Sequence, residues 1–180
     1  MSSRKQRKKQ TKHLVVSAML CALGVVLMML GSFIEVLDLS TAVLASLLCI
    51  WAVIEIGGAY PWLIWGVTSL LAFLLLPQKT PVVFYTLFAG YYPILKEKLE
   101  RKFRPAIAIP IKLVIFHAAL LLIYGALRLF IPSVLGDLIG IWMLLGTYAL
   151  AVVAFLVYDY ALTKLISGYF FRWRKYFKMK

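Results

Sequence analysis

Charged residues are scarce in this 180-residue chain, and the few that occur are gathered in blocks. They make up 15% of the sequence, against about 25% in a typical soluble domain, while 63% of the residues are hydrophobic. Between positions 14 and 95 the only charged residues are Glu35, Asp38, Glu55 and Lys79. A stretch of this composition would aggregate in water, so it indicates an integral membrane protein.

Residues that build catalytic and metal sites are also scarce. The sequence has two histidines, His13 and His117, and two cysteines, Cys21 and Cys49. It has no phosphate-binding loop, no dinucleotide fingerprint and no Gly-x-Ser-x-Gly motif. Both cysteines fall inside apolar runs, which is typical of small buried residues rather than of a disulfide or a metal site. We therefore expect no enzyme activity, no cofactor and no metal site.

The net charge of +13 could indicate a nucleic-acid partner. However, most of the cations flank apolar runs, as they do in the cytoplasmic loops of membrane proteins. We therefore expect membrane lipids, and not nucleic acid, among the partners.

Six apolar runs are expected to cross the bilayer as helices, for which about 20 residues are needed. They are 13–33, 41–56, 61–76, 81–95, 106–130 and 138–166. The second and third are separated by "GGAYP" and could instead be short or partly re-entrant. The expected fold is all-α, a six-transmembrane-helix bundle over 13–166. A basic segment over 1–12 precedes it, and a basic aromatic tail over 167–180 follows it.

The basic residues predict the orientation of this bundle. Most of them lie in three segments: 1–12, the loop expected after the fourth span at 96–104, and 172–180. Six spans place all three on one side. By the positive-inside rule, both termini are expected in the cytoplasm of a cell-membrane protein. Five spans would put the basic tail outside, which the charges argue against. The N-terminus could also begin a signal peptide, but no convincing cleavage site follows, so we interpret the first run as a retained span.

Candidate ligand contacts gather in the expected outer half of the bundle, on its outer loop and within the fifth span. They are Glu35, Asp38, Trp65, Thr68, Tyr85, His117, Tyr124, Trp142 and Tyr148. Aromatic belts, helix capping and a hydrogen bond from the histidine to a neighbouring helix would explain most of them without a ligand. A bundle mouth with several rings and a few polar groups is also typical of a small-molecule pocket. Because asparagine is absent, such a pocket would be aromatic and apolar.

Small residues recur at a spacing of four in the first apolar run. The stretch "SAMLCALG" and the valine after it place Ser17, Cys21 and Gly24 on one track and Ala18, Ala22 and Val25 on the next. Small residues four apart let another helix come close. That helix can belong to the same chain or to a partner, and the spacing does not decide between them.

The order of these features resembles the substrate-binding S components of energy-coupling factor (ECF) vitamin transporters. The resemblance is carried by the basic N-terminus, by "SAMLCALGVVL", by the outer loop "EVLDLS" and by "AVLASLLCIWAVIEIGG", and it is best over 12–100. It implies that Ala18 and Ala22, which match the family's Ala-x-x-x-Ala motif, contact a transmembrane coupling protein that works with two ABC ATPases. It also implies that a vitamin-like small molecule is captured outside and released inside when the loaded subunit rotates in the membrane.

The chain also departs from that family. S-component pockets usually include Asn, Gln or charged groups on the later helices, and metal-specific members carry an N-terminal His motif that is missing here. The resemblance therefore assigns no substrate. One alternative is a non-catalytic membrane scaffold of cell-envelope assembly with a similar six-helix fold, which the sparse polar residues favour. A small membrane enzyme or lipid-handling protein is a further alternative, for which no catalytic pair can be named.

Overall fold

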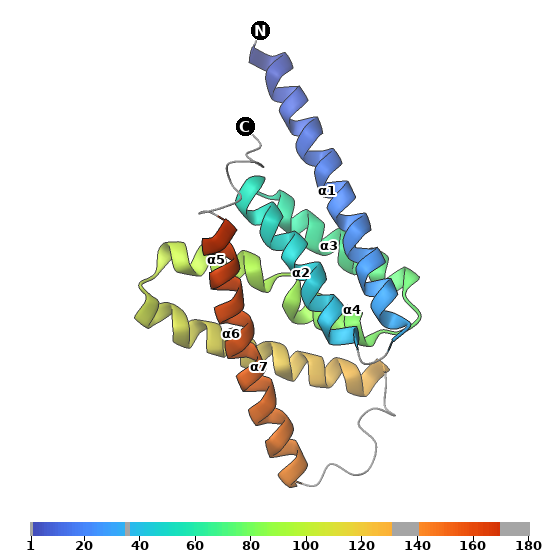
Figure 1. Ribbon diagram of the computed structural model, residues 1–180, viewed down its shortest axis with the longest axis vertical. Helices are drawn as coiled ribbons and strands as arrows, with labels where there is room; N and C mark the ends of the chain where they lie inside the picture. The colour runs from blue at the N-terminus through green and yellow to red at the C-terminus, as the bar shows by residue number, and fades with distance from the viewer. Residues whose placement is uncertain (1, 35–36, 131–140, 170–180) are drawn as a thin grey trace. The chain divides into compact units, whose positions relative to one another are not determined.

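The computed structural model describes residues 2–34, 37–130 and 141–169, and this part of the chain is all-helical (Figure 1). Its elements in chain order are α1 (Ser2–Ser32), α2 (Asp38–Glu55), α3 (Tyr60–Leu75), α4 (Thr80–Phe84), the π-helix η2 (Tyr85–Ala89), α5 (Tyr92–Lys102), α6 (Pro105–Phe130) and α7 (Ile141–Gly168). The chain divides into two compact units, Met1–Ile123 and Tyr124–Lys180. The expected all-α class is confirmed.

Four segments of these helices are long and apolar enough to cross a membrane. They are Gln6–Ser32, Asp38–Glu55, Ile107–Ala126 and Leu145–Gly168. They correspond to the first, second, fifth and sixth expected spans. The helix α3 is apolar but has 16 residues, or about 24 Å at 1.5 Å per residue, against a hydrocarbon core of about 30 Å. The chain thus has helices suited to a bilayer, while the number of crossings stays a prediction.

The fourth expected span, 81–95, is not a continuous α-helix. The helix α4 ends at Phe84, the five π-helical residues of η2 follow, and a turn precedes α5. Pro93 lies in the first turn of α5, where a missing N–H costs no helical hydrogen bond. The helix α5 then continues to Lys102. The expectation that a loop begins at Lys96 was therefore wrong.

The join between α2 and α3 is a tight turn built on two glycines. Gly57 and Gly58 both have φ of +65°, a left-handed conformation that costs glycine little and other residues more. The N–H groups of Ile56 and Gly57 both donate to the carbonyl of Ala52, which closes the end of α2. The second and third apolar runs are thus two separate helices joined by a short turn.

The core of the first unit forms where α1 packs against α2 and α3 (Figure 1). Glycines on α1 make this close approach possible. A Cβ at Gly31 would lie 2.1 Å from the Thr41 hydroxyl oxygen on α2, and a Cβ at Gly24 would lie 3.2 Å from a methyl carbon of Thr68 on α3. The packed interior next to these contacts consists of Val25, Met28, Ala42, Ala45, Ala72, Leu76, Val82 and Tyr85.

The second unit contains the described helix α7. Phe155 and Leu162 are buried, while most of the other described side chains of α7 are exposed. The Thr163 hydroxyl donates to the carbonyl of Asp159 at 2.9 Å, and the Ser167 hydroxyl donates to the carbonyl of Thr163 at 2.8 Å. These hydroxyls satisfy their hydrogen-bonding capacity within the helix, as Ser and Thr commonly do in membrane spans.

Candidate functional site

An aromatic cluster surrounds the π-helix η2. The indole N–H of Trp65 donates to the carbonyl of Thr86 at 3.1 Å, and the Trp65 ring meets the ring of Tyr91 edge-on at 6.0 Å. Gly90 makes room for this packing, because a Cβ there would lie 2.5 Å from Trp65 Cδ1 and 2.9 Å from the Tyr85 ring. Single π-helical turns often mark functional positions. The structure thus brings two expected ligand residues, Trp65 and Tyr85, to either side of one glycine.

Three of the expected ligand residues are buried in the first unit. Thr68 and Tyr85 each expose 1% of their surface, Thr68 facing Gly24 on α1 and Tyr85 filling the central core cluster. Asp38 exposes 5% and lies in the first turn of α2, where the helix dipole favours a negative charge. All three therefore contribute to packing as the structure stands.

His117 makes a hydrogen bond within its own helix. Its ring nitrogen Nδ1 lies 2.7 Å from the carbonyl oxygen of Leu113, one turn earlier in α6. Since a carbonyl only accepts, this contact assigns the Nδ1–H tautomer. The ring is half-buried and also meets the ring of Phe116 edge-on at 5.5 Å.

The structure does not test the placement of four other expected ligand residues. Tyr124 and Tyr148 belong to the second unit and expose 37% and 45% of their surface. Glu35 and the side chain of Trp142 lie outside the described residues. The expected pocket therefore stays a prediction for these four positions.

The two small-residue tracks of α1 have different surroundings. Ser17, Cys21 and Gly24 are buried, and the Cys21 thiol lies 3.8 Å from the carbonyl oxygen of Ile64 on α3. Ala18 and Ala22 are exposed. Val25, the third residue of the second track, is buried in the core. Packing within the chain therefore accounts for the first track and for Val25, and leaves Ala18 and Ala22 available to another molecule.

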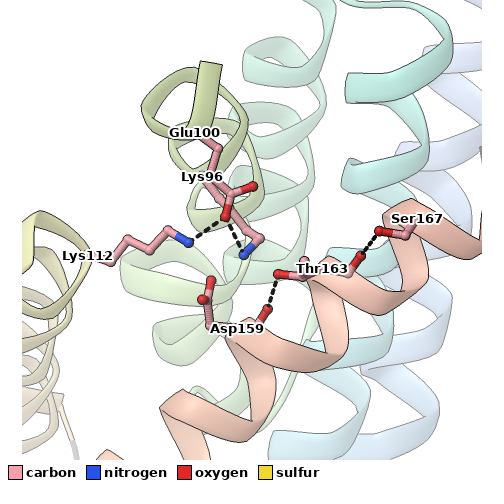
Figure 2. A network of polar contacts seen from close by, with 6 residues as sticks. All are labelled: Lys96, Glu100, Lys112, Asp159, Thr163 and Ser167. Atoms are coloured by element: carbon pink, nitrogen blue, oxygen red, sulfur yellow. Dashed lines mark hydrogen bonds and ion pairs between the residues drawn. The ribbon is translucent and has the colours of Figure 1, made fainter. Parts of the chain in front are cut away.

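A charged cluster that the sequence did not predict joins α5 to α6. Figure 2 shows that the ammonium groups of Lys96 and Lys112 both point at the carboxylate of Glu100. The distances to its Oε1 are 2.8 Å from Lys96 Nζ and 2.5 Å from Lys112 Nζ. The side chains of Lys96, Lys112 and Glu100 are 0%, 6% and 39% exposed. Only the i, i+4 spacing of Lys96 and Glu100 could have suggested this pair from the sequence.

The two lysines determine the charge of Glu100. Partial burial alone would raise the pKa of this carboxyl group, but the hydrogen bonds and positive charges of Lys112 and Lys96 outweigh burial and lower the pKa from its ordinary value of 4.5. Glu100 is therefore ionised at neutral pH. The cluster accordingly contains two buried cations that both bind the partly exposed carboxylate of Glu100.

Two ring contacts place the N-terminal segment and the cations of α5 at the same end of the first unit. The ring of His13 on α1 meets the ring of Tyr60 at the start of α3 at 5.5 Å. Lys98 Nζ lies 5.1 Å from the ring centre of Trp62, also on the first turn of α3. His13 and Lys98 thus contact neighbouring residues at the start of α3, while the side of the membrane on which the basic segments lie stays a prediction.

Comparison with known proteins gave no match, either to a protein-family model, to a curated protein or to a solved structure. The function is therefore inferred from the helices and contacts of this chain.

Proposed function

We propose that this chain is the substrate-binding S component of an ECF-type importer and that it docks on a transmembrane coupling protein through α1. The observation that carries the proposal is the exposure of Ala18 and Ala22 on a helix whose neighbouring small-residue track is buried. Small side chains let the backbone of a partner helix approach closely in a membrane, where van der Waals packing replaces the hydrophobic effect. Larger exposed side chains, Met19 at 66% and Val26 at 51%, flank the two alanines.

In this account the chain has no catalytic role. It captures a small vitamin-like molecule from outside the cell, and two ABC ATPases drive the coupling protein so that the loaded subunit rotates and releases the molecule inside. Trp65 and Tyr85 are the best-placed contacts, because Tyr85 begins the π-helix and both side chains approach Gly90. Since Tyr85 is 1% exposed, a ligand reaches it only if η2 or α3 moves.

The same burial favours a second candidate. If Thr68 and Tyr85 serve only to fill the core, the chain is a non-catalytic membrane scaffold of cell-envelope assembly. Such a scaffold would also use the exposed face of α1, but it would need neither a ligand nor ATPases.

Co-purification tests the leading proposal. The tagged protein is extracted in mild detergent from membranes of its own host, and its partners are identified by mass spectrometry. A coupling protein and two ATPases are expected with the wild type and absent with the double variant Ala18→Trp/Ala22→Trp. Ala118→Trp is the matched control, since Ala118 is an exposed alanine on α6, and it should keep all three partners.

Other outcomes separate the two candidates. If no ATPase appears and the double variant behaves as the wild type, the proposal fails. If envelope proteins co-purify instead and are lost in the double variant, the result supports the scaffold function. Native mass spectrometry adds an independent readout, because an S component is expected to retain a small molecule that a scaffold lacks.

A further inference from the structure

The helix α1 is longer than a bilayer requires. Its 31 residues span about 46 Å at 1.5 Å per residue, whereas the hydrocarbon core is about 30 Å thick. The apolar run begins at Leu14, so the surplus lies at the basic N-terminal end. If the chain spans a membrane, the turns next to Leu14 stand at the level of the lipid headgroups, a layer about 5–8 Å deep, and the first residues of α1 extend beyond it.

One face of these turns is a shallow groove between side chains of α1 alone, and it is open to solvent. It is lined by Arg4, Arg7, Lys8, Thr11, Lys12, Val15 and Val16. These positions repeat at three or four residues, so they share one face of the helix. The cations lie toward the N-terminus and the two valines lie where the apolar run begins, and no described lining residue is a carboxylate. The Thr11 hydroxyl donates to the carbonyl of Arg7 at 2.9 Å, so the donors available to an anion are the four cationic side chains.

We propose that this groove binds the headgroup of an anionic phospholipid. The guanidinium group of Arg7 presents paired N–H donors that match a phosphate, Lys8 and Lys12 add positive charge beside it, and Arg4 adds positive charge farther from the bilayer. Val15 and Val16 then face the start of the acyl chains. A free phosphate would use the cations but would have no use for the apolar end.

Neighbouring contacts support a position at the membrane surface. The ring of Tyr60 contacts His13, one residue beyond Lys12, and Trp62 holds Lys98 over its face. Tyrosine and tryptophan are enriched at this level of a bilayer. Each cation near an anionic surface contributes roughly a fivefold increase in binding, so a groove with four cations would give a strong preference. An RNA strand could use the same cations but would have to lie against the bilayer and the valines.

Native mass spectrometry of the full chain tests the proposal. The protein is reconstituted with equal amounts of phosphatidylglycerol and phosphatidylcholine, and the lipids that stay bound are counted. The wild type should retain phosphatidylglycerol preferentially. The variant R4Q/R7Q/K8Q/K12Q should lower that preference at least roughly tenfold, while R4K/R7K should keep most of it. The matched control carries the same charge change on exposed residues that make none of these contacts, R101Q/K102Q/R104Q/K164Q, and should resemble the wild type.

Three results would overturn the proposal. Equal loss in the groove variant and the control would assign the preference to net charge alone. Displacement of the lipid by millimolar inorganic phosphate would assign the groove to a free anion. Tighter binding of a labelled RNA oligonucleotide than of phosphatidylglycerol, lost in the same variant, would assign it to nucleic acid. Circular dichroism of each variant confirms that the helix content is unchanged. The outcome is independent of the docking proposal, because neither Ala18 nor Ala22 lines the groove.

Discussion

Replacing Glu100 with glutamine should destabilise the first unit far more than a surface substitution would. Lys96 Nζ and Lys112 Nζ each approach the same carboxylate oxygen, so the two nitrogens are at most about 5.3 Å apart. Two like charges at that separation repel by about 3 kcal/mol at an effective dielectric constant of about 20. Both lysines have further interactions, which lower this figure. The expected loss in the free energy of unfolding is about 2 kcal/mol, within the range for breaking a partly buried ion pair.

The assay is thermal unfolding of the detergent-solubilised protein, followed by tryptophan fluorescence. A loss of about 2 kcal/mol corresponds to a fall in Tm of about 4–8 °C for a chain of this size. Glu97→Gln is the matched control. Glu97 lies on the same helix, is also 39% exposed and faces the 78% exposed Arg101 at 3.4 Å, so it should cost less than about 1 kcal/mol. Adding Lys112→Met to Glu100→Gln removes one of the two cations and should restore part of the Tm. Equal effects of the two glutamine substitutions would refute the reasoning.

Three further predictions concern pH, packing and topology. The pKa of Glu100 is lower in the folded chain than its ordinary value of 4.5. The ionised carboxylate therefore stabilises the fold fully above pH 4.5, and this stabilisation is lost as the pH falls through the lower pKa of the folded chain. The Tm difference between the wild type and Glu100→Gln should accordingly stay constant from pH 7 to 5.5 and shrink at more acidic pH; a constant difference down to pH 3 would contradict the lowered pKa. Gly90→Ala places a Cβ 2.5 Å from an indole carbon of α3 and should cost about 1–3 kcal/mol, whereas Gly66→Ala meets nothing within 4 Å and should be neutral or stabilising; unfolding measurements that rank them the other way would refute the packing. In intact cells, a membrane-impermeant thiol reagent should label Lys79→Cys from outside and Lys98→Cys only after lysis, and the reverse pattern would overturn the orientation.

The positions of the apolar runs were enough to predict the helical class and most of the helix boundaries. The apolar runs that correspond to α1, α2, α6 and α7 are long. Gly57 and Gly58, followed by Pro61, mark the turn between α2 and α3. The burial of one track of α1 and the exposure of Ala18 and Ala22 on the next could not be read from the spacing. Both tracks carry small residues, and only the packing against α2 and α3 distinguishes them.

The π-helix and the charged cluster around Glu100 could not be predicted from the sequence, because they depend on contacts between distant residues. Nothing local in "FYTLFAGYY" favours a π-helix, and the hydrogen bond from Trp65 to Thr86 joins residues 21 apart. Lys112 reaches Glu100 only because the chain turns between α5 and α6. Lys96 was expected in an exposed loop because a charged side chain usually lies in water. In the structure it is buried, because the carboxylate of Glu100, one helical turn later, binds its ammonium group.

The most direct test of the account is site-specific photo-crosslinking on α1 in living cells. A photoreactive phenylalanine analogue is placed at Ala22, on the exposed small-residue track, and in a parallel variant at Leu121, which is 74% exposed on α6. Position 22 should crosslink to one integral membrane protein that co-purifies with two ATPases, and position 121 should not. If both positions give the same products, or if position 22 crosslinks only to lipid, then α1 is not a docking surface and the central claim is wrong.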